Sequence, residues 1–322
     1  MSRTSLIAIA LLLAARAAGA QDWPTRPVTM VVPYAAGGPT DAVGRVVAQR
    51  LSVELGQQVV VENIGGAGGM TGSSRVAHAA PDGNTFLFAG AGSQVFNQLL
   101  YKKPLYDAVT DFTPVALLTE QGLVLIVRKE LPANRFGEFI DYLKTNTNAN
   151  FGSAGAGSTT HLGCVFLNVA IGVNASHVPY RGAAPAMQDL IAGRIDYMCD
   201  LTPDALPQIE GRTVKPIAML TRLRSPVLPA LPTAAEQGLV DFDGSSWYGL
   251  FLPKGTPAAI VRKLHDAAAA ALENQVLRGR LQSLGVEVVA PERRSSEYLA
   301  SFLKQELVKW AAPIKASGIT AD

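Results

Sequence analysis

A run of small residues followed by hydroxyl and acidic side chains is the first candidate for chemistry in this sequence. Residues 34–41 read Tyr-Ala-Ala-Gly-Gly-Pro-Thr-Asp and follow the short apolar run Val28–Val32. We expect a strand, a glycine turn and then a helix, for which Thr40 and Asp41 are typical N-cap residues. Unpaired N–H groups and the positive end of the helix dipole would then point at one spot, which suits an anion. The alternative is that a turn from strand to helix simply needs glycine.

The same pattern recurs near the middle of the chain. Residues 151–160 run from a predicted strand end through glycines to hydroxyl residues, and a helix through Ala170 follows. A third glycine-rich loop, Gly65–Gly72, has neither the Lys-Ser/Thr pair of a phosphate-binding loop nor the glycine spacing of a dinucleotide-binding motif. We interpret it as a second floor of exposed N–H groups beside the first turn. Another small-residue stretch, residues 90–93, follows a predicted strand at Thr85–Ala89.

Together these loops favour holding an anion without reacting with it. Hydrogen bonds to a charged group contribute about 1.5–3 kcal/mol each. Four or five of them reach roughly 6–15 kcal/mol before the entropy cost, and micromolar binding needs about 8 kcal/mol. No arginine clamp is therefore required. The hydroxyl-bearing members of the loops are Thr40, Ser93, Ser153, Ser158 and Thr159.

Several charged or titratable side chains could touch the same ligand, and each has an ordinary structural alternative. His161 could face a ligand, or it could cap or pack its helix. Arg181 could reach a carboxylate, or it could form a surface ion pair. Asp200 ends a predicted strand, where it could accept from a ligand amine or hydroxyl, order water, or hold a neighbouring backbone N–H. Asp41 is expected to cap its helix and not to touch a ligand.

No catalytic constellation accompanies these residues. The sequence has no G-x-S-x-G elbow, and none of its four histidines lies in H-E-x-x-H or H-x-H spacing. The two cysteines have no paired histidines nearby, so no zinc pattern is present. We therefore expect no metal site, no cofactor and no enzymatic activity.

The rest of the chain alternates predicted strands and helices, which indicates an α/β fold. Beyond the segments above, we expect strands at 59–63, 112–119, 123–128, 178–182, 195–200, 216–221 and 247–252, and helices at 73–80, 136–144, 184–192 and 258–272. The layout of residues 122–144 is echoed from residue 247 onward, which suggests two similar lobes. We place lobe 1 at 21–122 plus 224–322 and lobe 2 at 123–223, joined by crossing strands near 118–124 and 217–223.

The N-terminus predicts export. A positive charge at Arg3, the apolar run Leu6–Ala15 and the small residues at Ala18–Ala20 are typical of a secretory signal peptide that spans residues 1–20 and is cleaved before Gln21. A membrane anchor would need roughly 20 apolar residues, and Arg16 interrupts the run too early. Removing the peptide leaves 26 of the 28 basic residues against 26 acidic ones, and this balance argues against nucleic acid as a partner.

Composition and cysteine content fit an exported, folded protein. Hydrophobic residues make up 48% of the 322-residue chain and charged residues only 17%, which permits real cores. Export makes a disulfide between Cys164 and Cys199 permissible. It would close a loop of about 35 residues and stabilise the fold by roughly 3–4 kcal/mol. Two buried free thiols are the alternative; we favour the bond.

Six ordered motifs resemble the solute-binding receptors of tripartite tricarboxylate transporters, the Bug family. They are Val32–Asp41, Asn63–Gly72, Pro81–Gly83, Gly152–Leu162, Val178–Met187 and Leu252–Pro257, and they span nearly the whole mature chain. The resemblance implies a type II periplasmic binding protein: two α/β lobes joined by two crossing strands, with a ligand cleft between them. A Cys164–Cys199 pair is not expected of every member.

The resemblance also implies which residues bind the ligand. Tyr34–Asp41 would grip a carboxylate with backbone groups, and Ser153–Thr159 would face it from the other lobe, partly through bridging waters. Asp200 lies where the family varies its ligand contacts. The resulting ligand-binding set is Tyr34, Ala36, Gly37, Gly38, Thr40, Asp41, Gly68, Ser93, Ser153, Gly155, Ser158, Thr159, His161, Arg181 and Asp200.

The implied function is that of a monomeric periplasmic receptor. It would capture a small organic mono- or dicarboxylate, aliphatic or aromatic, and deliver it to the permease subunits of the transporter. Two alternatives remain open: an extracytoplasmic enzyme acting on a carboxylate in the same cleft, and a receptor that presents its closed form to a sensor kinase. Turnover of the bound acid would identify the enzyme, and a pull-down of the membrane partner would separate the two receptors.

Overall fold

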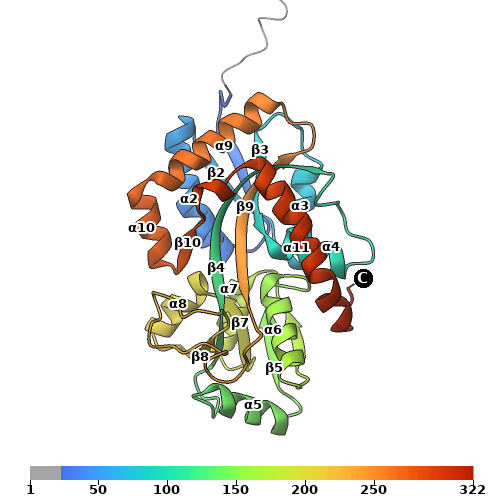
Figure 1. Cartoon of the computed structure of the whole chain (residues 1–322), viewed down its shortest axis with the longest axis vertical. Coiled ribbons are helices and arrows are strands. Elements are labelled where there is room, and N and C mark those ends of the chain that lie inside the picture. The colour runs from blue at the N-terminus through green and yellow to red at the C-terminus, as the bar shows by residue number, and fades with distance from the viewer. Residues whose placement is uncertain (1–22, 322) are drawn as a thin grey trace, which may run out of the picture.

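The computed structural model describes residues 23–321, and Figure 1 shows them as two bodies connected by long central strands. The predicted signal peptide and its cleavage site lie outside the described residues. The strands are β1 (Val28–Val32), β2 (Val59–Asn63), β3 (Thr85–Gly90), β4 (Phe112–Arg128), β5 (Asn150–Ser153), β6 (Ser176–Pro179), β7 (Tyr197–Leu201), β8 (Val214–Met219), β9 (Ser245–Pro253) and β10 (Val286–Val288). The helices are α2 (Pro39–Leu55), α3 (Met70–Ala77), α4 (Asn97–Leu100), α5 (Phe136–Thr145), α6 (Thr159–Ala170), α7 (Ala183–Ile191), α8 (Thr202–Glu210), α9 (Ala258–Glu273), α10 (Gln275–Ser283) and α11 (Ser296–Ala316).

Three short helical turns complete the described elements. η1 (Ala67–Gly69) and η3 (Pro291–Arg293) are 3₁₀ turns, and η2 (Gly92–Phe96) is a π-helical turn that leads into α4. Most of the predicted elements are present within a few residues of their expected bounds. None of the helices in the described part of the chain is long and apolar enough to span a bilayer.

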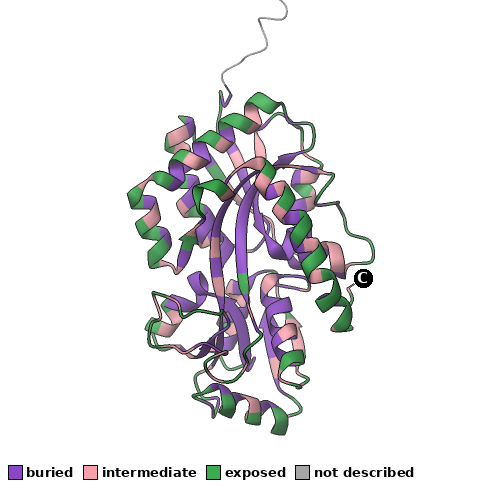
Figure 2. Cartoon of the chain, in the orientation of Figure 1, coloured by how far each residue is buried: buried purple, intermediate pink, exposed green. Residues whose placement is uncertain are grey.

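The upper body in Figure 1 is built on β1, β2 and β3, which are parallel, followed by β9 and β4, which are antiparallel to their neighbours. Both faces of this sheet are covered. Met30 and Val32 of β1 belong to the core under α2 and α9, and Val31 belongs to the core under α3 and α11. This explains why β1 reads as a continuous apolar run without alternation. Figure 2 shows the strands buried and the outer helix faces exposed.

One strand runs through both bodies. β4 pairs with β9 over Phe112–Gly122 and with β7 and β8 over Leu123–Arg128. The prediction of two separate strands here was wrong, because the polar residues Glu120 and Gln121 that interrupt the apolar pattern pair with β9 on one side and with β10 on the other. The backbone therefore stays extended through the crossing, and β4 joins the two lobes.

The second connection returns close to the first. Leu220 donates its N–H to the Leu123 carbonyl at 2.8 Å, and Leu123 donates to the Gly244 carbonyl at 2.9 Å. Between these points, residues 224–243 bond to β8 and α5, which belong to the lower body. From these contacts we propose that the chain re-enters lobe 1 near Gly244 and not near residue 224, while the first boundary stays near residue 122.

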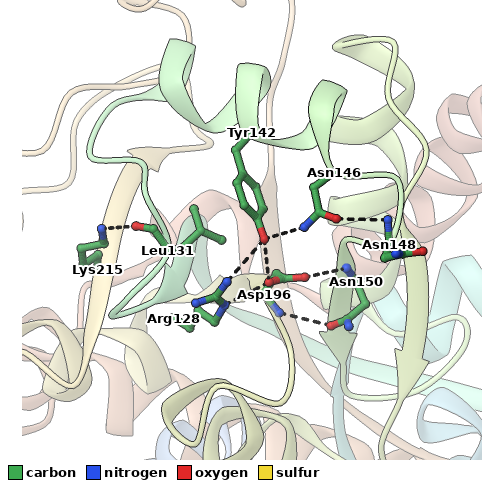
Figure 3. Close-up of polar contacts among 8 residues, drawn as sticks. All are labelled: Arg128, Leu131, Tyr142, Asn146, Asn148, Asn150, Asp196 and Lys215. Atoms are coloured by element: carbon green, nitrogen blue, oxygen red, sulfur yellow. Dashed lines mark hydrogen bonds and ion pairs between the residues drawn. The ribbon is translucent and has the colours of Figure 1, made fainter.

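A polar cluster fastens the far end of the lower body, as Figure 3 shows. The Asp196 carboxylate accepts from Arg128 Nε at 3.0 Å, from the Tyr142 hydroxyl at 3.1 Å and from the Asn150 N–H at 3.0 Å. These groups come from β4, α5 and β5, so one carboxylate ties three elements together. The cluster lies at the C-terminal end of β4, away from the point near Gly122 where the strand passes between the lobes. It stabilises the lobe that carries Ser153.

The predicted disulfide is confirmed. Cys164 on α6 and Cys199 on β7 are bonded, fully buried, and their Cα atoms are 5.3 Å apart. The bond attaches α6 to the strand that leads to Asp200.

Replacing both cysteines with alanine should lower the free energy of unfolding by about 3–4 kcal/mol, because the denatured chain then loses a loop constraint of 35 residues. Urea unfolding of the double variant C164A/C199A measures this difference. The wild type in reductant is the matched control and should approach the variant. Equal stabilities for oxidised wild type and double variant would contradict the expected contribution.

Candidate functional site

The two lobes touch along backbone in two places. We call the first contact seam 1. It joins the loop after β1 to the loop before α7: Ala35 donates its N–H to the Arg181 carbonyl at 3.2 Å. A Cβ built on Gly182 would lie 2.8 Å from the Ala35 N atom, and one built on Gly65 would lie 2.4 Å from the Arg181 oxygen. Glycine is needed here because peptide groups of opposite lobes approach one another directly.

The second contact, seam 2, joins η1 and η2 of lobe 1 to the loop before α6. A Cβ built on Gly68 would lie 2.0 Å from the Ala156 carbonyl oxygen, and one on Gly92 would lie 2.9 Å from the Thr159 N atom. The Tyr101 hydroxyl also donates to the Ala156 carbonyl, at 3.2 Å. The lobes are therefore closed against each other, and the Gly65–Gly72 loop serves this contact. Gly65 and Gly68 of this loop pack against backbone atoms of the opposite lobe. This does not agree with the interpretation of the loop as a surface of exposed N–H groups.

A narrow cavity of about 20 Å³ lies between the seams. Its walls come from both lobes, so an occupant would touch both at once. The lining residues are Tyr34, Gly38, Pro39, Thr40, Gly90, Gly92, Ala154, Ser158, Thr159, Thr160, Ala183, Leu201 and Tyr248. No lysine, arginine or histidine is among them. Within residues 23–321, no group of three or more His, Cys, Asp or Glu side chains is placed to hold a metal ion.

Helix N-termini converge on this cavity. α2 has Gly38 as N-cap, α6 has Ser158 and α7 has Gly182, and each helix places a residue of its first turn in the lining. α8 begins directly after the lining residue Leu201. Each helix start carries unpaired N–H groups and roughly half a positive charge. Positive potential from two lobes therefore meets at a cavity whose lining has no basic side chain, which favours a negatively charged group there.

The side chains of the walls are held by one another. The Thr40 and Tyr248 hydroxyls are 3.0 Å apart, and the Tyr34 hydroxyl donates to the Gly68 carbonyl at 3.0 Å. The Ser158 hydroxyl accepts from the His161 N–H at 3.2 Å. Burial raises the pKa of both tyrosines, so they stay neutral. The wall therefore has fixed hydroxyl dipoles and no ionised group among its lining side chains.

The structure brings five of the predicted site residues to the cavity: Tyr34, Gly38, Thr40, Ser158 and Thr159. Asp41 lies behind the turn, where it accepts from the Gly37 N–H and from Arg45 Nε, each at 2.9 Å. Burial alone would raise the pKa of Asp41, but these bonds from Arg45 and Gly37 lower it. The expected N-cap role of Thr40 or Asp41 was wrong: Gly38 is the N-cap and a proline opens the helix, which suits its fixed φ.

Three further predicted residues, Ser153, Gly155 and His161, stabilise the loop before α6 and do not line the cavity. The Ser153 hydroxyl accepts from the Gly155 N–H at 3.1 Å and lies 2.6 Å from His177 Nε2. His161 Nδ1 accepts from the Gly157 N–H at 3.2 Å, and its ring stacks on His177 at 3.9 Å. Burial, and then the neighbouring His177, lowers the pKa of His161 to about 3. A neutral ring is required for this bond, so His161 shapes the loop and does not line the cavity.

The remaining predicted residues lie outside the lining. Ala36 and Gly37 are exposed, and a Cβ built on Gly37 would lie 3.6 Å from the Ala184 Cβ of the opposite lobe. Ser93 is buried in η2, with its carbonyl accepting from Tyr106. The Arg181 side chain is exposed, and only its carbonyl takes part, in seam 1. Gly68 lies in seam 2, and Asp200 is fully buried at the end of β7, where it accepts from the Leu201 N–H at 2.9 Å.

Sequence reasoning missed part of the wall. Ala183, Leu201 and Tyr248 line the cavity and were not proposed as ligand contacts. A signal for Ala183 was present, since Gly182 follows a predicted strand end and precedes a helix, as Gly38 does. As the first residue of α7 it would offer a backbone N–H, which any residue type except proline would supply. Tyr248 gave no local signal, because it comes from β9, far along the chain from the turn that it contacts.

Comparison with known proteins agrees with this architecture. The family model described as "Tripartite tricarboxylate transporter family receptor" (TctC) matches residues 43–319. A protein encoded in the ttuE–ttuC' intergenic region of Agrobacterium vitis is 42% identical over 316 residues, which cover 96% of this chain and 91% of that protein.

Two solved structures are similar over almost the whole chain. The periplasmic binding protein BugD superposes with a TM-score of 0.90 at 40% identity, covering 93% of this chain and 100% of that one. MatC from Rhodopseudomonas palustris, solved with bound malate, gives a TM-score of 0.88 at 41% identity, covering 91% and 100%. The predicted two-lobed periplasmic binding protein fold is confirmed. The chain belongs to the TctC family of tripartite tricarboxylate transporter receptors, the Bug proteins, as its motifs implied.

Proposed function

We propose that this protein is a periplasmic receptor that closes on a small organic carboxylate and delivers it to the permease subunits of a tripartite tricarboxylate transporter. One observation carries the proposal: helices α2, α6 and α7, from both lobes, begin at a single cavity whose lining has no basic side chain. Backbone N–H groups and helix dipoles are the recognised means of binding an anion in such a place. The related MatC was solved with malate.

The fold supplies a mechanism for capture. β4 and the return near Gly244 form the connection about which the lobes would move, as in other hinge-bending receptors. A carboxylate that accepts hydrogen bonds from both walls has differential affinity for the closed form, and this difference shifts the population toward closure. Seams 1 and 2 then exclude water from the charged contacts.

We also propose that binding occurs without turnover, and that the receptor is an exported monomer. Among residues 23–321, the hydrogen-bond partners of the Ser158 hydroxyl are the His161 N–H and the Thr160 hydroxyl, and neither is a base. A nucleophile needs such a base for activation. The family name favours a permease over a sensor kinase as the membrane partner.

A thermal-shift panel tests the proposed function. Aliphatic and aromatic mono- and dicarboxylates, with malate among them, should include acids that raise the melting temperature, since a ligand at 100 times its Kd adds about 2.7 kcal/mol. The neutral amides of the same acids are matched controls and should have no effect. Incubated acid should be recovered unchanged. A panel without any stabilising acid, or consumption of the acid, would overturn the proposal.

A further inference from the structure

Two buried carboxyl groups lie beside the cavity. Asp200, the penultimate residue of β7, has no exposed surface, and Asp204 in the first turn of α8 is 9% exposed. The Oδ2 atom of each is buried and finds no donor among the groups of residues 23–321. The two side chains are nevertheless within hydrogen-bonding reach of each other. Since an ionised carboxylate only accepts, a hydrogen bond between them requires a proton on one of them.

The surroundings of the pair offer no compensating cation among the described residues. Asp200 is opposite Val124 of β4, and α8 packs on β4, β7, β8 and α2. From β9, Tyr248 is the titratable group that faces both aspartates. The charged residues near the start of α2, Asp41 and Arg45, are bonded to each other.

Two like charges in this setting cannot both be ionised near neutral pH. Burial raises the pKa of Asp204 to about 6. Burial, and then repulsion by Asp204, raises the pKa of Asp200 well above its usual range. The pair therefore behaves as a unit that holds at least one proton.

The charge of the pair reaches the cavity. Leu201, which follows Asp200, lines the cavity wall, and so does Tyr248. Burial raises the pKa of Tyr248, and negative charge on the Asp200–Asp204 pair raises it further. An anion in the cavity would repel the charge of the pair in the same way. Protonating the pair removes that repulsion.

We propose that Asp200 and Asp204 share one proton and take up a second when a carboxylate binds in the adjacent cavity, so that capture is coupled to proton uptake. This inference rests on the proposed function. It gives the pair a role in selecting ligand charge: it disfavours a second negative group at this wall and favours one that is neutral or can donate a hydrogen bond.

Calorimetry with malate as the probe tests the coupling. Titrations at pH 7 in buffers of different ionisation enthalpy should show net proton uptake, and affinity should fall by up to tenfold for each unit between pH 6 and 8. The double variant D200N/D204N keeps the shape and hydrogen-bonding capacity of the pair. It should bind malate without proton uptake and with little pH dependence, whereas the exposed control D266N should behave like wild type.

Stability provides a readout that needs no ligand. A raised carboxyl pKa in the folded state stabilises the fold fully below the unfolded value near 4 and loses that contribution as the pH rises toward the folded value, which for Asp204 is about 6. The stability of D200N/D204N relative to wild type should therefore increase from pH 4 to pH 6. A pH-independent difference overturns the inference, and so does malate binding without proton uptake. A panel in which no acid binds would instead defeat the proposed function, and the stability comparison would still decide whether the proton is shared.

Discussion

Replacing Gly68 with alanine should weaken carboxylate binding by about 100-fold or more, equivalent to at least about 2.7 kcal/mol. The new Cβ would lie 2.0 Å from the Ala156 carbonyl oxygen and 2.9 Å from the Ser158 N atom, both backbone groups of the opposite lobe. Neither can swing aside as a side chain would, so the lobes could not close fully. The open protein does not need this approach, and its fold should persist.

Calorimetric titration with malate, or with the strongest acid from the panel, measures the effect. Gly56→Ala is the matched control, because Gly56 also has a positive φ, +66° against +58° at Gly68, but nothing lies within 4 Å of its added Cβ. Both variants carry the same backbone strain, and only one obstructs closure. If G68A binds as tightly as G56A, closure through seam 2 is not required for binding.

Replacing Gly38 with valine should abolish measurable binding while leaving the melting temperature within a few degrees of wild type. Gly38 has φ −87° and ψ 178°, a conformation open to any residue, so the backbone is not strained. Its Cβ would stand 3.6 Å from the Ala184 N atom and 3.7 Å from the Ala183 Cβ. The γ-methyl groups of valine would then fill the cavity in front of the α2 and α7 N-termini.

Gly38→Ala supplies a graded control. Its single methyl group makes ordinary contacts and should cost much less affinity than valine. Binding is measured by calorimetry and folding by circular dichroism. Wild-type affinity in G38V would remove the α2 N-terminus from the site. Equal losses in the two variants would contradict the claim that the γ-methyl groups fill the cavity.

Much of the fold could be predicted from local patterns. The apolar runs Val28–Val32 and Val59–Val61, each ended by glycine, proline or polar residues, are strands as expected. The continuity of β4 could not be predicted in this way, because Glu120 and Gln121 break the apolar pattern but have partners in β9 and β10. Tertiary pairing decided the outcome over the local signal.

The site was predictable where a turn and a helix start were adjacent in sequence, as at Gly38 and Ser158. It was not predictable at Ala183, the first residue of α7, because a helix start that offers a peptide N–H leaves no trace in the residue type there. The role of Gly68 depends on Ala156, which lies on the other lobe and is distant in sequence. The glycines indicated that the backbone closely approaches another group, but they did not indicate which group.

A crystal structure of the protein with malate or the strongest panel acid bound tests the central claim most directly. We predict closed lobes with carboxylate oxygens within hydrogen-bonding distance of backbone N–H groups at the starts of α2, α6 and α7. An acid held instead by lysine or arginine side chains on an outer surface, with this cavity unused, would contradict it.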